Sequence, residues 1–564
     1  MFLKIGSISR RYRHIKRYRQ IVSVLLKHGL GDLVTRAELY RQLGISRRFF
    51  TMRKAEASLT PLTRWQRFRM VLEELGPSFI KLGQLASTRP DLVPPEACAE
   101  FEKLQDTVPA FPVSHARQII ETELGKPLEV LFKDFDETPV ASASVSQVHR
   151  AVLPDGTVTA IKVQRPGIRA TIEVDLEIMF DLAELIEKHI QGMETLDPTG
   201  IVQEFSRTIK RELDFDIEAG NIERFARNFQ SDTTTYVPKV YRHLSTDKVL
   251  VMEYVEGIKV SDLDALTDAN LDLELIANRG ADIILKQIFE HGFFHADPHP
   301  GNILVLPDNV VCLLDYGMTG TLTGRTREQL GNLIYGIVRR DAKRMTRSLL
   351  SLSQREGTEA VESLEADIAD FVEQHLYRPL KDMHIGSLLT QLVQLLMHHN
   401  LQLPPVLYLL DKALITVEGN GRRLSPEFDS IEHMKPFVRQ LLSERLSIRK
   451  LRKDFYATSL DWEAVLRELP ANTRNIIDKI KRGKIRIEFE HKGLEPMLRT
   501  HDRISNRLVY GIVLSSLVIG SSLIVLSGIP PKWHEIPIIG IIGFLTAGAM
   551  GFWLLVSILK HGKM

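Results

Sequence analysis

Two uncharged apolar runs near the C-terminal end constrain the fold of this 564-residue chain most strongly. They are LVYGIVLSSLVIGSSLIVLSGI (508–529) and IPIIGIIGFLTAGAMGFWLLVSIL (536–559). Each run, as a helix, is long enough to cross about 30 Å of hydrocarbon, and the intervening PPKWHE allows only a turn. The alternative is a pair of buried helices in a soluble core, but two adjacent charge-free runs of this length are rare outside membranes. The sequence therefore predicts two transmembrane helices within residues 501–564.

The basic residues around these runs indicate how the hairpin is oriented. Those that flank the pair are Arg499, Arg503, Arg507, Lys560 and Lys563. The turn between the runs carries a single cation, Lys532. Because loops rich in lysine and arginine stay in the cytoplasm, we expect both ends of the hairpin, and the soluble body, on the cytoplasmic side.

Composition limits the remaining function classes. A net charge of +2 gives no global field that would attract nucleic acid, and Cys98 and Cys312 alone supply neither a disulfide framework nor a zinc pattern. Positive charge is nevertheless concentrated in residues 1–50, which contain twelve lysines and arginines and only two acidic residues. This segment is either a membrane-surface helix or the solvated face of a helical subdomain. It lacks the interleaved aromatic residues of a nucleic-acid arm, so we expect no nucleic-acid partner.

Residue patterns divide the soluble body into three parts. Residues 1–111 are helical in pattern, and residues 112–257 contain alternating apolar segments around the turn Pro154–Gly156 that indicate a β-hairpin. Residues 258–500 are mainly helical. The fold class expected is α+β, with two lobes of different secondary structure that bracket a ligand cleft.

The segment HGFFHADPHPGNILVLPDNVVCLLDYG (291–317) carries the strongest chemical signal. Asn302 opens an apolar strand, a turn at 307–309 leads into a second strand, and Asp315 follows it. Folding this hairpin brings Asn302 and Asp315 together, where their oxygens suit Mg²⁺. Asp297, in the preceding loop, is placed to accept a proton from a hydroxyl group or to orient a water molecule. This arrangement is typical of phosphoryl transfer.

Two other interpretations compete for this segment. His291, His295 and His299 recur every four residues like zinc ligands, but Pro298 and Pro300 break any helix that would place them on one face. Asp and Asn are also common as simple turn residues. That explanation accounts for any one of the three polar residues but poorly for all three at these spacings.

An upstream lysine strengthens the phosphoryl-transfer interpretation. Lys162 interrupts the apolar strand TAIKVQ, and a buried ammonium group needs an anionic partner. The segment before it, VASASVSQV, supplies a small-residue bend through which backbone amides can approach phosphate. We predict that the whole of this segment contacts the nucleotide: Val140, Ala141, Ser142, Ala143, Ser144, Val145, Ser146, Gln147 and Val148.

The order of these motifs resembles the protein-kinase signature set. More closely, the chain resembles the UbiB family of atypical kinase-like proteins. The segments that carry this resemblance are KLGQ (81–84), ASAS (141–144), RELDFDIEAGN (211–221) and HADPHPGNILV (295–305). With the terminal hairpin, the resemblance spans nearly the whole chain. It implies a two-lobed protein-kinase-like fold with a helical N-terminal extension and a C-terminal transmembrane hairpin.

The resemblance also implies residue roles and the cofactors ATP and Mg²⁺. Lys162 would contact the α and β phosphates and form an ion pair with either Glu212 or Glu218. The remaining glutamate could form an ion pair with Lys81. Asp297 would be the nominal base, and Asn302 and Asp315 would bind magnesium. The linker strand at 252–255 would face adenine, through Glu253 and Val255 among others. Lys81 and Gln84 would be regulatory, on a helix that lies across the cleft and blocks a protein substrate.

The sequence departs from ordinary protein kinases in three ways. Tyr316 replaces the usual phenylalanine, no APE segment follows the DYG motif, and a long insertion separates Lys162 from Glu212. The lack of an APE segment weakens a claim to peptide substrates. The helix that the resemblance places across the cleft, with Lys81 and Gln84, favours ATP hydrolysis or action on a small lipid-like molecule.

The resemblance implies a multi-pass protein of the bacterial inner membrane that supports ubiquinone biosynthesis. Its partners would be membrane lipids, above all polyprenyl quinone precursors, or ubiquinone biosynthetic enzymes. A true protein kinase, a small-molecule phosphotransferase and a nucleotide-switched scaffold remain as alternatives. The sequence names no phosphoryl acceptor, and it leaves open a homodimer.

Overall fold

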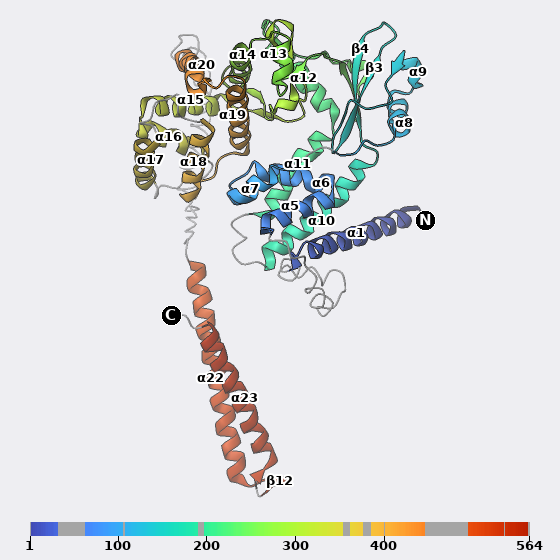
Figure 1. The fold of residues 1–564 in the computed structure, drawn as a ribbon. Helices are drawn as coiled ribbons and strands as arrows, with labels where there is room; N and C mark the ends of the chain where they lie inside the picture. The colour runs from blue at the N-terminus through green and yellow to red at the C-terminus, as the bar shows by residue number, and fades with distance from the viewer. Residues whose placement is uncertain are drawn as a thin grey trace, which may run out of the picture. The chain divides into compact units, whose positions relative to one another are not determined.

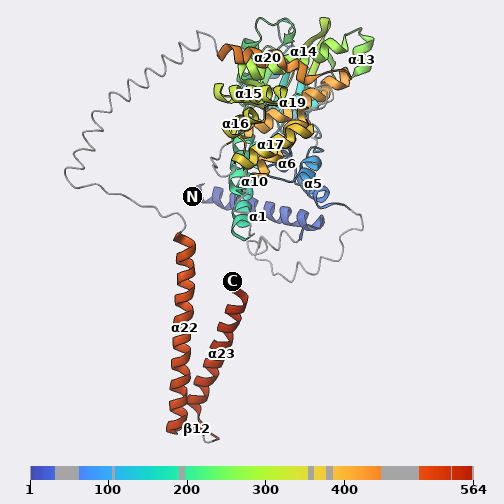
Figure 2. The same ribbon diagram turned by 90° about the vertical axis from the view of Figure 1, so that its left-hand side faces the viewer.

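The structure is a computed structural model that describes residues 2–31, 62–104, 108–189, 197–353, 361–375, 385–399, 401–445, 494–534 and 536–561. The chain divides into two compact units, Met1–Lys453 and Asp454–Met564. The two lobes and the N-terminal helices of the first unit appear in Figure 1, and Figure 2 gives the view at right angles. The architecture is mixed helix and strand, which confirms the predicted α+β class.

Helices of the N-terminal extension pack with two helices from the insertion around a common apolar core. A break at Gly76–Pro77 separates two of these helices, and Gly76 has a φ of 95°, which other residues adopt only with strain. Thr63 begins the first of the two with a capping box. The helices of this part are α1 (Phe2–Lys27), α5 (Arg64–Leu75), α6 (Pro77–Ser87), α7 (Pro95–Phe101), α10 (Ile168–His189) and α11 (Pro198–Glu212).

The N-lobe contains a five-stranded antiparallel sheet in the order β1-β3-β4-β6, with β2 also paired to β3. Side chains alternate between its two faces. Ile161 and Val163 pack towards α8, whereas Ala160 packs towards α12. The elements are α8 (Val113–Leu124), α9 (Leu128–Leu131), β1 (Asp134–Phe135), β2 (Ala141–Ser142), β3 (Ser146–Val152), β4 (Val158–Gln164), α12 (Phe215–Asn228) and β6 (Val249–Glu253).

The segment that follows α10 forms two separate helices, α11 and α12. The chain breaks at Leu213–Asp214, where the Asp214 carboxylate accepts the backbone N–H of Asp216 and begins α12. Since the break lies between Glu212 and Glu218, it places the two acidic residues on separate helices.

The C-lobe begins with short strands and continues as a helical array. A four-stranded sheet has the order β5-β10-β9-β7, and β8 pairs with β11. The predicted hairpin over 303–313 is confirmed as β9 and β10, with Ile303 opposite Leu313. The strands are β5 (Thr235–Tyr236), β7 (Ile258–Lys259), β8 (Phe293–His295), β9 (Ile303–Leu306), β10 (Val310–Leu313) and β11 (Thr319–Thr321).

The C-lobe helices share two apolar cores, one beneath the strands and one within the helical array. The α-helices are α13 (Leu263–Asp268), α14 (Leu273–Leu285), α15 (Gly324–Arg339), α16 (Ala342–Leu352), α17 (Val361–His375), α18 (Ile385–His398), α19 (Pro405–Leu424) and α20 (Ser430–Arg445). Short helices of other types are η2 (Arg242–Leu244), η3 (Lys286–His291), η4 (Pro300–Asn302) and η5 (Pro307–Asn309). Residues 446–493, which belong to the predicted C-lobe (258–500), lie outside the described residues.

The second unit is a helical hairpin of α22 (Leu494–Ser527) and α23 (Ile538–His561), connected by the two-residue strands β12 (Lys532–Trp533) and β13 (Ile536–Pro537). Leu508–Ser527 and Ile538–Leu555 are long and apolar enough to cross a membrane. The helices approach closely at Gly543, where an added Cβ would lie 2.0 Å from Ser521 Oγ.

Candidate active site

A cavity of about 530 Å³ lies between the N-lobe sheet, the C-lobe hairpin and helices α6, α11 and α19. It combines the predicted catalytic and metal-binding residues with the regulatory pair. The predicted site residues that line it are Lys81, Gln84, Ala143, Val145, Ser146, Lys162, Glu212, Glu218, Asp297, Asn302 and Asp315. Residues more than 230 positions apart in sequence, such as Lys81 and Asp315, therefore share one space.

Lys162 is the central cation of the cavity. Its register in β4 places the side chain on the face that packs against α12, where Glu218 belongs to the buried stripe. The Nζ atom donates to both Glu218 oxygens, at 2.7 and 2.8 Å, and lies 3.7 Å from Asp315 Oδ1. Desolvation acts to lower the pKa of Lys162, but the charges of Asp315 and Glu218 outweigh it and raise the pKa above its ordinary value. The ammonium group is therefore charged at neutral pH.

Asp315 is held as a carboxylate directly after β10. Partial burial acts to raise its pKa, whereas the Lys162 charge and a 2.9 Å hydrogen bond from the Gly317 N–H hold the pKa well below its ordinary value. The buried His295 donates its Nε2–H to the Asp315 carbonyl oxygen. Burial also lowers the pKa of His295, so this ring stays neutral and serves to position the loop.

Asp297 and Asn302 lie at opposite ends of the turn that precedes the hairpin. His295 Nδ1 accepts the Asp297 N–H at 3.2 Å, and the Asn302 carbonyl oxygen accepts the Leu314 N–H at 3.0 Å. The second bond fixes Asn302 beside the residue that precedes Asp315. The side chains of Asn302 and Asp315 are hard oxygen donors of the kind that Mg²⁺ prefers. These two residues therefore fit a magnesium ion that also takes phosphate oxygens and water.

The structure assigns the two ion pairs that the sequence left open. Glu218 pairs with Lys162, and Glu212 pairs with Lys81 at 2.6 Å. Gln84 Nε2, one turn beyond Lys81 on α6, donates to the Leu104 carbonyl oxygen at 3.2 Å. Helix α6 is thus tied to α11 at the edge of the cavity.

The small-residue segment contributes only part of its predicted side chains. Ala143, Val145 and Ser146 line the cavity. Val140, Ala141, Ser142, Ser144, Gln147 and Val148 do not line it. Gln147 is fully buried instead, where its Oε1 accepts the Phe111 N–H at 3.1 Å and its Nε2 contacts His149. Contacts from the backbone of this segment to phosphate stay a prediction.

The acidic side chain of the linker strand, Glu253, does not line the cavity. Glu253 accepts from Tyr236 Oη at 2.7 Å and from the Lys239 N–H at 3.2 Å. Val255 does not line the cavity either, and an adenine contact by either residue stays a prediction.

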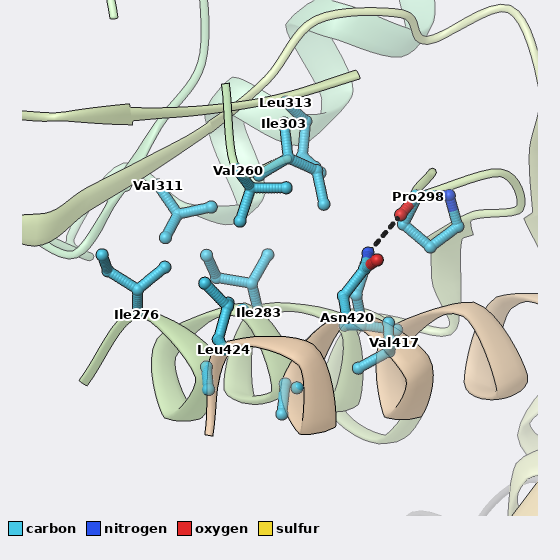
Figure 3. Close-up of a pocket in the computed structure, with 15 residues that line it drawn as sticks. Val260, Ile276, Ile283, Pro298, Ile303, Val311, Leu313, Val417, Asn420 and Leu424 are labelled. Carbon is cyan, nitrogen blue, oxygen red and sulfur yellow. Dashed lines mark hydrogen bonds between the residues drawn. The ribbon is translucent and has the colours of Figure 1, made fainter. Parts of the chain in front are cut away.

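Sequence reasoning missed a basic residue of the site. Lys412 of α19 lines the cavity, and its Nζ lies 2.9 Å from Asp297 Oδ1. Two turns further along the helix, Asn420 donates to the Pro298 carbonyl oxygen at 3.0 Å, and both residues lie at one side of a small apolar pocket that Ile303 and Leu313 also line (Figure 3). No motif surrounds Lys412 in the sequence, and 115 residues separate it from Asp297. Only the fold brings them together.

Comparisons with known proteins place these features in a family. Three family models match: the ABC1 atypical kinase-like domain over 103–349, the UbiB helical domain over 368–429 and the ABC1/UbiB kinase-like C-terminal domain over 492–560. Two similar relatives carry the name probable protein kinase UbiB. The Marinobacter nauticus protein is 35% identical and covers 83% of this chain and 86% of its own length. The Pseudomonas aeruginosa protein is 37% identical and covers 78% and 84%.

A third relative has a name that states no activity. It is the Clostridium pasteurianum protein described as an uncharacterized protein in the hydrogenase 1 5' region. It is 34% identical over 500 residues, which cover 88% of this chain and 94% of that protein.

Proposed function

The chain belongs to the ABC1/UbiB family of atypical kinase-like proteins, and we propose that it binds Mg-ATP in the cavity around Lys162. The terminal phosphoryl group would pass to water or to a membrane-held acceptor in support of ubiquinone biosynthesis. The family membership supports a kinase-like and ubiquinone-related role. The reaction and the acceptor are part of the proposal.

The observation that carries the proposal is the position of Lys162 between two carboxylates. One of them, Glu218, comes from α12 and holds the ammonium group bidentately. The other, Asp315, follows the hairpin and is a suitable magnesium ligand. An ammonium group held in this way is positioned to meet the nucleotide phosphates while a metal ion occupies the adjacent carboxylate.

The chain's own residues divide the remaining work. Magnesium, when bound by Asn302 and Asp315, would neutralise the phosphate charge that develops during transfer. Asp297 lines the same cavity as Asn302 and Asp315, and its carboxylate can orient the acceptor and take the acceptor's proton. His295 and the hairpin hold these residues in place through backbone hydrogen bonds.

The surroundings of the cavity favour a small or lipid-like acceptor over a peptide. Helix α6 contributes Lys81 and Gln84 to the cavity lining, where a peptide would need access. After Gly317 the chain forms only the short strand β11 before α15 begins at Gly324, which leaves little length for a peptide-binding loop. The two apolar helices of the second unit support action at a membrane, where a polyprenyl precursor would be held.

The test is phosphate release from Mg-ATP by the full-length protein, with and without anionic liposomes and a quinone-precursor mimic. Asp315→Asn is the control, since it removes the main cation ligand. We expect release that depends on Asp315 and rises with liposomes and mimic. Equal release by the wild type and Asp315→Asn would contradict the proposed site, and binding of nucleotide without release would favour a nucleotide-switched scaffold.

A further inference from the structure

Helix α19 contacts both the segment that follows α6 and the loop that begins at Asp297. Lys412 lies about one turn after Tyr408 and about two turns before Asn420 on the helix. The Tyr408 ring lies 5.1 Å from the Arg89 guanidinium, which follows α6. Lys412 reaches Asp297 and Asn420 holds Pro298, so the helix is docked directly on the loop that carries the proposed base.

This loop contains no permanently charged basic side chain. Between Asp297 and Asn302 the chain reads Pro298, His299, Pro300 and Gly301, without lysine or arginine. Phosphoryl transfer nevertheless depends on positive groups placed around the oxygens of the transferring phosphate. A cation on this side of the cavity must therefore come from another element.

Lys412 is the lysine on the cavity wall that contacts this loop. The other two lysines that line the cavity, Lys81 and Lys162, pair with Glu212 and Glu218 on the opposite lobe. The Lys412 side chain is 35% exposed, and its Nζ lies 2.9 Å from Oδ1 of Asp297. The flexible four-carbon stem lets the ammonium group contact Asp297 and an adjacent phosphate oxygen together.

We propose that Lys412 binds the terminal phosphate of the nucleoside triphosphate, as a cation that α19 contributes to the kinase-like cleft. This assignment rests on the proposed function, because it presumes that Mg-ATP occupies the cavity. It gives the helical segment 368–429 a direct part in the site: α19 completes the charge around the transferring group. Lys412 would then distinguish the triphosphate from the diphosphate, since only the former has a phosphate in reach.

The test compares Mg-ATP and Mg-ADP affinity of the full-length protein by calorimetry, for Lys412→Gln and Lys412→Arg. Lys286→Gln is the matched control, since its lysine is 32% exposed, forms an ion pair with Asp232 in the same lobe, and does not line the cavity. Thermal unfolding of each variant identifies any loss of folding.

The proposal predicts that Lys412→Gln weakens Mg-ATP binding about tenfold or more, as for a lost hydrogen bond to a charged group, while Mg-ADP binding changes less than about twofold. Lys412→Arg should retain most of the ATP affinity, and Lys286→Gln should change neither. Equal weakening of both nucleotides, or of neither, would overturn the assignment. So would faster turnover in Lys412→Gln, which would make the ion pair a block on Asp297. Failure of the wild type to bind either nucleotide would instead refute the proposed function itself.

Discussion

The Asp411 carboxyl group has a buried oxygen in an apolar part of the C-lobe, and its removal should change the pH dependence of stability. It lies on α19 at a cavity of about 40 Å³ whose other lining residues are all leucine or valine. Within the described residues, its buried Oδ1 has no hydrogen-bond partner. Desolvation raises the pKa of Asp411 from 3.8 to about 7 in the folded protein.

The magnitude follows from this difference in pKa. Below pH of about 4 the carboxyl is protonated in both states, so its burial carries no charge penalty. Between pH of about 4 and 7 the unfolded chain releases the proton while the folded chain retains it, so stability falls as the pH rises. Above that range the loss levels off at about 4 kcal/mol, by the conversion of a pKa difference into free energy. Asp411→Asn should recover most of this at pH 8 and little at pH 4.

Thermal unfolding of the full-length protein between pH 4 and 8 measures the effect. The melting temperature of Asp411→Asn should exceed that of the wild type by several degrees at pH 8, and the gap should close towards pH 4. Asp370→Asn, on the exposed face of α17 in the same lobe, is the matched control and should leave the profile unchanged. A gap of equal size at every pH would refute the assignment of a raised pKa to Asp411.

Three further predictions concern the cavity. Asp315→Asn should abolish magnesium-dependent nucleotide binding, which a magnesium titration at fixed ATP would show; unchanged binding would exclude Asp315 as the main cation ligand. Glu218→Ala should destabilise the protein by about 3 kcal/mol, the low end for a broken buried pair because Asp315 still faces Lys162, and a melting temperature equal to that of the wild type would contradict the pairing. Ala143→Gly should alter the ATP-to-ADP affinity ratio by loosening the bend before β3, and an identical ratio in both proteins would dismiss this role.

Features that depend on local pattern were predicted well from the sequence. The hairpin of β9 and β10 is encoded by two apolar runs around a turn at Pro307–Asn309, where Asp308 and Asn309 adopt positive φ. The break between α5 and α6 is likewise encoded at Gly76–Pro77. These signals lie within a few residues of one another, so a single sequence contains them.

Features that depend on long-range packing were not predicted. The helical period alone could not say which glutamate meets Lys162, because the chain breaks at Leu213–Asp214. Two-residue strands such as β5, which pairs in parallel with β10, carry too little pattern to detect. Gln147 was expected at the nucleotide but is buried against Phe111, a contact across 36 residues.

The central claim is that this cavity transfers the terminal phosphoryl group of Mg-ATP. It is tested most directly by following γ-labelled ATP in anionic liposomes that contain the full-length protein, with label measured on water-soluble phosphate, lipid and protein. The account predicts loss of label from ATP into phosphate or lipid, and none in Asp297→Asn or Asp315→Asn. Label that stays on ATP in the wild type, or that leaves it equally fast in both variants, would contradict the account.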